Sequence, residues 1–295
     1  MKDTMLNKLV IIGVGLIGGS FALALRKAGL VKYIVGLGRS QENLQCALEL
    51  GILDEVTDNF PRALKNADLV LLAAPVGQTT NILAQIEPHL ESKTVISDVG
   101  STKQDVIAAA RSSIPRHLEN FVPGHPIAGA EMSGANAANA DLFQDKYVIL
   151  TPLDETSADA LESIKKLWKG CGAHVSQMKP YQHDEILAMM SHLPHILAFA
   201  LMNHTFSPCT EENSNTLLCF AGSGFRDFTR IAGSSPEMWR DICLANRELL
   251  LNQIDAYQNE LTRMRGMLEN NDGLALEKAF FDARVARQKW LKDKH

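Results

Sequence analysis

The sequence predicts an α/β domain with a mainly parallel sheet, followed by an all-α domain. Strand-like and helical segments alternate as far as residue 176, and from Tyr181 the pattern is helical nearly to the end. The chain of 295 residues is longer than one ordinary core needs, and its 46% hydrophobic residues are enough to fill two. We therefore expect two domains, residues 1–179 and residues 180–295, with the boundary near Lys179–Pro180.

Each element follows from a local pattern. Short aliphatic runs predict the strands, and apolar residues at helical spacing predict the helices. The expected strands are residues 9–12, 33–38, 54–56, 68–75, 94–99, the start of 121–129, 147–152 and 173–176. The expected helices are residues 21–29, 41–50, 61–67, 79–89, a segment from residue 105, 157–170, 182–206, 239–264 and 274–292.

The first strand runs into a glycine turn of the form G-x-G-x-x-G and then into a helix. In this pattern Gly13 makes the bend, Gly15 lets a pyrophosphate approach the backbone, and Gly18 lets helix and strand pack closely. The backbone of Leu16 and Ile17 then faces the phosphates at the start of the helix. This context favours a dinucleotide-binding Rossmann domain over a purely structural turn.

The end of the second strand indicates which dinucleotide is bound. A site for NAD places Asp or Glu there, whereas a 2′-phosphate requires a small residue and an Arg. The sequence has Gly38, Arg39 and Ser40 at this point, so we expect NADP rather than NAD. The alternative is that Arg39 is an ordinary solvated loop charge.

The following strands end in residues suited to a nicotinamide and its substrate. Ala73 and Pro75 are small or apolar where the ring would lie flat, although Pro75 could simply end the strand. Ser101 follows the next strand, where its hydroxyl could touch substrate or nicotinamide and could also cap the next helix. His125 lies between Gly124 and Pro126, and a histidine in such a loop at the carboxyl edge of the sheet is placed for acid–base catalysis.

The helical half carries two further groups of candidate residues. His192 and His195 are three residues apart and should share one face of a helix. They lack the H-E-x-x-H spacing and an evident third ligand, so we expect a substrate-facing pair and no metal. Arg226 and Arg230 lie four apart after a glycine turn, and Arg can bind a carboxylate through two parallel hydrogen bonds. Their alternative role is surface salt bridging.

Composition and charge exclude several classes of partner. The net charge is −5 and the pI is near 6.0, so no basic field is present to hold nucleic acid or an acidic membrane surface. We identified no targeting segment and no apolar run long enough to span a bilayer, and we expect a cytoplasmic protein. The five cysteines have no C-x-x-C spacing, which is typical of reduced thiols. The long C-terminal helices carry apolar stripes that we expect to pair two subunits.

Five motifs occur in order along the chain and together resemble one family. They are G-x-G-x-x-G at residues 13–18, D-V-G-S-x-K at 98–103, G-H-P-I-A-G-x-E at 124–131, S-H-L-P-H at 191–195 and F-x-D-F-T-R-I-A at 225–232. In this combination the chain resembles the prephenate/arogenate (cyclohexadienyl) dehydrogenases of tyrosine biosynthesis. The resemblance implies a Rossmann domain, a helical domain that dimerises, and a substrate site between them.

The resemblance also implies roles for individual residues. His125 matches the histidine that takes the proton of the ring hydroxyl while hydride leaves the same carbon for the nicotinamide, after which the ring loses CO2. Ser101 matches a serine near that hydroxyl, and His195 a substrate-binding histidine. Arg230 matches the arginine that binds a substrate carboxylate, and Glu131 an acid that gates the pocket.

Two other functions compete with this interpretation. A β-hydroxyacid-type dehydrogenase has the same two-domain plan. Members of that family resemble one another through a catalytic lysine on the first helix of the helical domain, where this chain has His192 and His195. A protein that senses NADP without turnover would not need His125, Ser101 and Arg230 together. The sequence leaves open whether prephenate or arogenate is preferred.

Overall fold

A computed structural model describes residues 5–130, 132–206 and 219–293 of the chain. By its internal contacts the chain divides into two compact units, Met1–Arg247 and Glu248–His295. The first unit contains the sheets and the helices as far as residue 245, and the second contains two long helices. The functional boundary expected near Lys179–Pro180 stays a prediction.

The main sheet of the described residues has six parallel strands in the order β3-β2-β1-β4-β5-β6. This is the strand order of a doubly wound dinucleotide-binding domain, in which ligands bind at the carboxyl ends of the strands near β1 and β4. The strands are β1 (Leu6–Ile12), β2 (Val31–Leu37), β3 (Glu55–Val56), β4 (Leu69–Leu72), β5 (Val95–Asp98) and β6 (Phe121–Val122).

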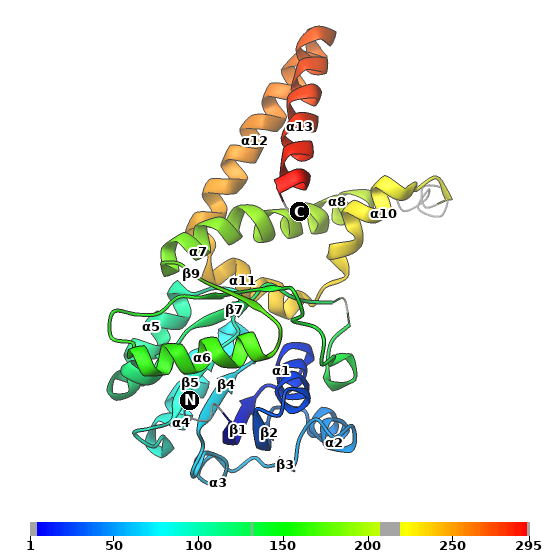
Figure 1. Ribbon diagram of the computed structural model, residues 1–295. Helices are drawn as coiled ribbons and strands as arrows, with labels where there is room; N and C mark the ends of the chain where they lie inside the picture. The colour runs from blue at the N-terminus through cyan, green and yellow to red at the C-terminus, as the bar shows by residue number, and fades with distance from the viewer. Residues whose placement is uncertain (1–4, 131, 207–218, 294–295) are drawn as a thin grey trace. The chain divides into compact units, whose positions relative to one another are not determined.

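Helices connect and follow these strands (Figure 1). Among the described residues of the first unit, the α-helices are α1 (Leu16–Lys27), α2 (Gln41–Glu49), α3 (Phe60–Leu64), α4 (Thr79–Ile86), α5 (Gln104–Ser113), α6 (Ala158–Gly170), α7 (Pro180–Leu187), α8 (Leu193–Thr205), α10 (Ser223–Thr229) and α11 (Pro236–Ala245). Parallel strands followed by a helical region confirm the fold class that the sequence predicts.

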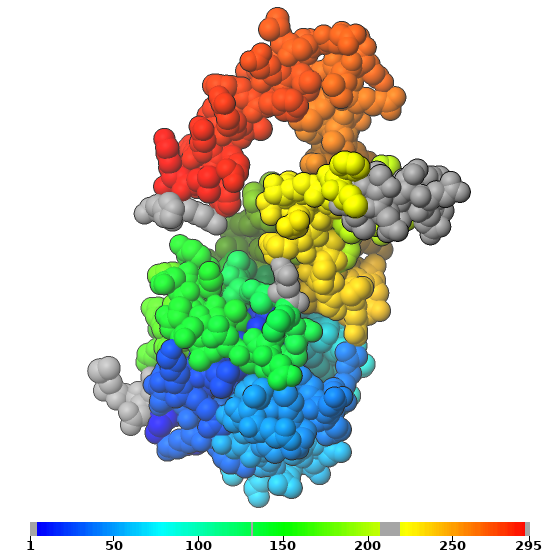
Figure 2. Space-filling model, turned by 90° about the vertical axis from the view of Figure 1, so that its right-hand side faces the viewer, coloured from blue at the N-terminus to red at the C-terminus, as the bar shows by residue number. Residues whose placement is uncertain are grey.

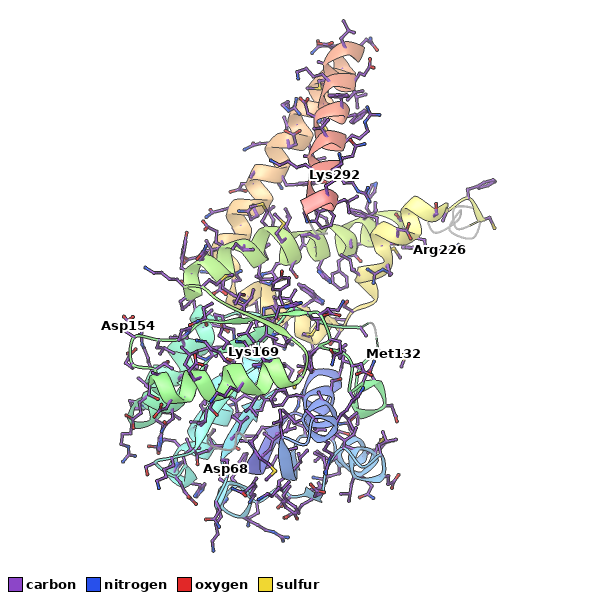
Figure 3. The ribbon with its side chains drawn as sticks, viewed as in Figure 1. Asp68, Met132, Asp154, Lys169, Arg226 and Lys292 are labelled. Carbon is purple, nitrogen blue, oxygen red and sulfur yellow. The ribbon has the colours of Figure 1, made fainter. Side chains whose placement is uncertain are left out.

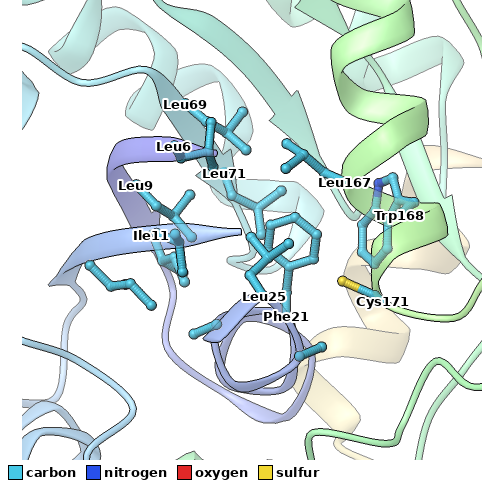
Figure 4. Packing of buried hydrophobic residues seen from close by; sticks show 14 of the residues in the cluster. Leu6, Leu9, Ile11, Phe21, Leu25, Leu69, Leu71, Leu167, Trp168 and Cys171 are labelled. Atoms are coloured by element: carbon cyan, nitrogen blue, oxygen red, sulfur yellow. The ribbon is translucent and has the colours of Figure 1, made fainter. Parts of the chain in front are cut away.

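Two apolar cores cover the two faces of the sheet, because successive strand residues point to opposite sides. In β1, Leu9 and Ile11 belong to one core and Val10 to the other. The first core is completed by α1, α2 and α6, and the second by α3, α4, α5 and α11. Figure 4 shows the first core, in which the rings of Phe21 and Trp168 lie 4.5 Å apart between their centroids.

A second sheet carries His125, which corrects the prediction of a loop at this position. β7 (Gly124–Pro126) pairs antiparallel with β8 (Tyr147–Leu150), and β8 pairs parallel with β9 (His174–Gln177). His125 lies opposite Ile149. The histidine is therefore held by a strand ladder, because the chain leaves the main sheet at Val122 and pairs again at once.

The segment before β8 packs beside the nucleotide-binding end of the main sheet. Asn43 accepts a hydrogen bond from the backbone N–H of Ala135 at 2.8 Å, and Ser20 accepts one from Asn139 at 2.9 Å. In Figure 2 the green surface of this segment adjoins the blue surface of α1 and α2. These contacts hold the segment against α1 and α2.

One continuous helix, Pro180–Thr205, contains α7, a π-helical segment Ala188–His192 and α8. By length and composition alone it could cross a membrane, which corrects the expectation that no such segment exists. Core helices of soluble proteins can have the same length and composition. Its buried polar residues His183 and Asp184 are hydrogen-bonded within the first unit.

The helix expected over residues 239–264 is divided in the structure. α11 ends at Ala245 and α12 (Arg247–Glu269) begins after Asn246, which has φ −107° and ψ 29°. The second unit consists of α12 and α13 (Gly273–Asp293), joined by a short turn. Expecting one helix from Trp239 to Met264 was therefore wrong at Asn246, whose side chain makes buried hydrogen bonds.

Candidate functional site

The glycine turn has the geometry that nucleotide binding requires. Gly13 has φ +101°, and a Cβ there would lie 2.6 Å from the backbone of Ala73. A Cβ on Gly18 would lie 2.4 Å from the carbonyl oxygen of Gly13, so α1 and β1 can pack closely only with glycine here. A Cβ on Gly15 would meet no atom within 4 Å. This open space in front of the first turn of α1 is where a pyrophosphate would fit.

A cavity of about 520 Å³ extends from this turn along the carboxyl edge of the sheet. Seven of the residues predicted to bind the cofactor line it, namely Gly13, Gly15, Gly38, Arg39, Ser40, Ala73 and Pro75. Leu16 and Ile17 do not line it, and the side chain of Ile17 packs on the first core. Their predicted contribution is thus limited to the backbone N–H groups at the start of α1.

The end of β2 presents Arg39 and Ser40, and both have protein partners. The guanidinium of Arg39 donates to Glu237 of α11 at 3.2 and 3.3 Å, with 67% of the Arg39 and 45% of the Glu237 side chain exposed. The hydroxyl oxygen of Ser40 accepts from the backbone N–H of Asn43 at 3.2 Å and caps α2. Arg39 therefore borders the cavity as a solvated cation with a carboxylate beside it.

His125 is the first member of a buried chain of polar side chains. Its Nδ1 lies 2.8 Å from Nε2 of His183, and Nδ1 of His183 lies 2.8 Å from the carboxylate of Asp184. The same carboxylate accepts hydrogen bonds from the backbone N–H groups of Lys103 and Gln104, at 2.8 and 2.9 Å. His183 and Asp184 are fully buried, so this chain is sealed from solvent behind His125.

The surroundings of this chain favour a neutral His125 and an ionised Asp184. Burial lowers the pKa of His125 well below 6.5, and the nearby His183 and Lys103 lower it further. Burial alone would raise the pKa of Asp184, but hydrogen bonds from His183 and from the backbone lower it below its ordinary value. At neutral pH His125 is thus available to accept a proton.

A buried ion pair joins the end of β5 to the strand that carries His125. The ammonium of Lys103, which is fully buried, contacts one carboxylate oxygen of Asp98. That oxygen also accepts from Gly100 N at 2.7 Å, and the other oxygen accepts from Gly124 N at 3.1 Å. Asp98 therefore holds both the turn containing Ser101 and the residue next to His125.

Ser101 lies at the carboxyl end of β5, as predicted, but it does not cap the next helix. Lys103 is the residue before α5 and makes no side-chain cap. The free N–H groups are instead bound by Asp184 of α7, which comes from 80 residues further along the chain. The alternative role given to Ser101 was therefore wrong, and its hydroxyl is not used as a helix cap.

His192 and His195 face the same aromatic side chain, which confirms that they share one side of the helix. The His195 ring stacks on Trp239 at 3.6 Å between centroids, and the His192 ring approaches the same indole edge-on at 6.0 Å. His192 is 1% exposed, and burial lowers its pKa to about 4. Burial also lowers the pKa of His195, and the positive charge of the nearby Arg230 lowers it further. Both rings are thus neutral near pH 7.

The two arginines predicted to bind carboxylate differ in position. Arg230 begins a 3-10 turn (Arg230–Gly233) that packs against α8, the helix of His195. Arg226 lies on α10 and is labelled in Figure 3, and both Arg226 and Arg230 are exposed. Glu131 lies outside the described residues. In the part of the chain that the structure describes, no three His, Cys, Asp or Glu side chains are grouped to hold a metal ion.

Sequence reasoning missed several residues of this site. His183 and Asp184 supply the chain behind His125, Lys103 and Asp98 the buried ion pair, and Trp239 the surface on which His195 stacks. One signal was present: His183 and Asp184 are adjacent ionisable residues at the start of the helix that also carries His192 and His195. Nothing in the sequence showed that this pair lies against His125.

Comparison with known proteins agrees with this geometry. Residues 21–177 match the nucleotide-binding domain of prephenate dehydrogenase, and residues 179–281 match its dimerization domain. The chain is 42% identical to a prephenate dehydrogenase of Bacillus subtilis, covering 97% of this chain and 76% of that protein. It is 37% identical to a cyclohexadienyl dehydrogenase of Zymomonas mobilis, covering 96% of each.

A solved structure extends the comparison to three dimensions. Prephenate dehydrogenase from A. aeolicus, in complex with hydroxyphenyl propionate and NAD+, is 34% identical and superimposes with a TM-score of 0.89. The alignment covers 96% of this chain and 98% of that one. The chain therefore belongs to the prephenate dehydrogenase family.

Proposed function

We propose that this protein catalyses the oxidative decarboxylation of prephenate or arogenate, or of both, in tyrosine biosynthesis. The products are 4-hydroxyphenylpyruvate and tyrosine, respectively, and the hydride goes to NAD(P)+. The observation that carries the proposal is the position of His125. A neutral histidine is fixed by a buried polar chain and is tied through Gly124 to Asp98, at the same sheet edge as the nucleotide cavity.

His125 acts as the general base in this proposal. A bound oxidised nicotinamide supplies the acceptor for the hydride. His125 takes the proton of the ring hydroxyl as the hydride leaves the carbon that bears it, and Ser101 contacts the same hydroxyl. Loss of CO2 then makes the ring aromatic, and this driving force calls for neither a metal nor a covalent electron sink. The low pKa of His125 supports the role, because the ring stays neutral at cellular pH.

The helical side of the site holds the substrate. Arg230 binds a substrate carboxylate through its planar guanidinium, and the neutral rings of His195 and His192 line the same pocket. The charge of Arg230 at His195 supports placing them in one pocket. We also retain Arg226 as a second anion contact and Glu131 as the acid that gates the pocket.

We propose NADP as the favoured cofactor, with NAD as the alternative. Arg39 and Ser40 line the cavity, and β2 itself ends without the carboxylate that binds a ribose 2′-OH, although Asp58 also lines the cavity. An exposed ion pair such as Arg39–Glu237 is worth only about 0–1 kcal/mol, so a phosphate dianion can displace Glu237. Arg39→Ala should raise the KM for NADP by about tenfold and leave that for NAD almost unchanged. A wild-type preference for NAD would contradict the proposal.

We further propose a homodimer formed through the C-terminal helices. The match to a dimerization domain supports it, as do the exposed apolar side chains on α12 and α13, among them Leu261, Phe280 and Trp290. Light scattering coupled to gel filtration measures the mass directly. A monomer at micromolar concentration would rule the dimer out.

The activity itself is tested by a matrix of kcat/KM values. Prephenate and arogenate are each assayed with NADP and with NAD, following reduced nicotinamide by absorbance and CO2 release in parallel. Reduced nicotinamide and CO2 should form in equal amounts with at least one of the two substrates. Absence of turnover with every combination would favour a protein that binds the dinucleotide without catalysis.

A further inference from the structure

We propose that His183 is a positioning residue for His125: it accepts the Nδ1–H of His125 and so leaves the Nε2 lone pair of His125 free to take the substrate proton. This inference rests on the proposed function, in which His125 is the base. His183 lies outside the five sequence motifs, and it is fully buried directly behind His125.

The partners of Asp184 fix its proton content. Its carboxylate accepts two backbone hydrogen bonds, from Lys103 and Gln104, so it is held as an anion at the start of α5. An ionised carboxylate has only acceptor sites. The 2.8 Å contact with Nδ1 of His183 therefore requires that His183 carry a proton on Nδ1.

If both rings are neutral, the hydrogen bond between His183 and His125 has only one possible direction. A neutral His183 with its proton on Nδ1 has a bare Nε2, which can only accept. This Nε2 lies 2.8 Å from Nδ1 of His125, so His125 donates from Nδ1 and its own Nε2 is bare. Asp184 and His183 thus select the tautomer of His125 that a general base needs.

The alternative arrangement requires His183 to donate from both ring nitrogens, with His125 accepting at Nδ1 and carrying its proton on Nε2. Charged or titratable groups that face the His125–His183 pair are Lys103 before α5, His192 in the π-helical segment and Asp184 on α7. Asp98 reaches His125 through Gly124. Lys103 brings a positive charge to the buried space, and only Asp184 offsets it directly at His183.

Removing the acceptor has a predictable consequence. Without His183, the proton of neutral His125 can move to Nε2, the position that imidazole side chains favour in water. His125 then presents a donor where a base is needed, as happens in serine proteases when the carboxylate behind the catalytic histidine is replaced. We expect His183→Phe to lower kcat by about 10²-fold, within the range of general-base contributions, with a change in KM of less than about threefold.

Two further variants separate positioning from packing. His183→Gln has an amide oxygen that can accept the same Nδ1–H, and it should regain at least about tenfold of the lost kcat. His89→Phe, at an exposed histidine that makes none of the contacts of the site, is the matched control and should leave kcat unchanged. If the glutamine variant is no better than His183→Phe while both are folded, the positioning role is wrong.

A spectroscopic test needs no loss of activity. The full chain labelled with ¹⁵N-histidine, with NADP+ present, is examined at pH 8 by long-range ¹H–¹⁵N correlation, and the signals of residue 125 are assigned with His125→Asn. We expect a protonated Nδ1 and a bare Nε2 in the wild type, and the reverse in His183→Phe. A proton on Nε2 of wild-type His125 would overturn the inference. Failure of the proposed function shows separately, as unchanged kcat in His125→Asn.

Discussion

The buried pair of Lys103 and Asp98 offers the sharpest test of how the fold supports the site. In Lys103→Met the ammonium is lost, while the methionine side chain fills most of the same volume. The carboxylate of Asp98 then stays buried with two backbone N–H donors, from Gly100 and Gly124, and no counter-charge. Both the stability of the chain and the charge state of His125 should respond.

The expected magnitude follows from burial. Removing one partner of a buried ion pair typically costs about 3–5 kcal/mol, because the other charge is left uncompensated. The side chains of Lys103 and Asp98 are 0% and 3% exposed, so solvent cannot take over the role of the missing ammonium. The two backbone hydrogen bonds offset part of the loss, so we expect about 3 kcal/mol.

The assay is urea denaturation of the full chain, followed by tryptophan fluorescence and analysed for the free energy of unfolding. Lys27→Met is the matched control, since it breaks an ion pair with Asp141 whose side chains are 61% and 53% exposed. That pair should contribute no more than about 1 kcal/mol. A loss in Lys103→Met as small as in Lys27→Met would refute the reasoning.

Activity gives a second, independent readout of the same substitution. The charge of Lys103 is one of the causes that lower the pKa of His125, after burial and His183. Its removal should therefore raise the pKa of His125 and move the acidic limb of kcat to higher pH. An unchanged acidic limb would show that Lys103 does not act on His125 electrostatically.

Three further predictions concern the base, the substrate anchor and the cofactor. His125→Asn should lower kcat by about 10²- to 10⁴-fold and abolish the acidic limb of the pH–rate profile. In the wild type this limb should lie below pH 6.5, because burial lowers the pKa of His125 and the ring stays a neutral acceptor down to that lower pH. Near-normal kcat would move the role to His192 or His195. Arg230→Lys should raise KM by about 10- to 100-fold, since a point charge cannot replace the planar guanidinium at a carboxylate; unchanged KM in a folded variant would place Arg230 outside the site. Glu237→Gln should lower the KM for NADP by a factor of about 2–5 and leave that for NAD unchanged, because it removes a competitor for Arg39 worth at most about 1 kcal/mol; equal effects on both cofactors would argue against this competition.

The parts of the site that were predicted from sequence depend on local stereochemistry. Within one strand–turn–helix unit, Gly13 is required by its φ of +101° and Gly18 by its close approach to the carbonyl oxygen of Gly13, so their spacing alone was enough. Gly38, Arg39 and Ser40 could also be located from local sequence, because they come directly after the last residue of β2. A residue placed by its own element can be found without knowing what the element packs against.

The pairing of β7, β8 and β9 could not be predicted in the same way. A short strand such as Gly124–Pro126 has no periodicity of its own, and its partner Val148–Leu150 lies more than 20 residues away. The chain could equally have continued as a loop at the edge of the main sheet. His125 was therefore identified as a candidate, but its support by a strand ladder was not.

The break between α11 and α12 has a similar origin. Asn246 lies in a continuous helical pattern, and only its buried contacts distinguish it. Its side-chain amide donates to the carbonyl oxygen of Asp184 at 2.8 Å and lies 3.1 Å from Nδ1 of His192. Because both partners come from the helix of residues 180–205, the sequence around Asn246 contains no sign of this interaction.

Asp184 connects these separate contacts into one arrangement. Its carboxylate caps α5, which begins just after the turn of Ser101, and it fixes the proton on His183 behind His125. Its carbonyl oxygen receives the amide of Asn246, which also reaches His192. A shift of α7 by one residue would therefore disturb the serine turn, the base and the helical side of the site together. The catalytic groups come from distant parts of the sequence, and Asp184 links the elements that carry them: Oδ1 binds Lys103 N and His183, Oδ2 binds Gln104 N, and the carbonyl oxygen binds Asn246.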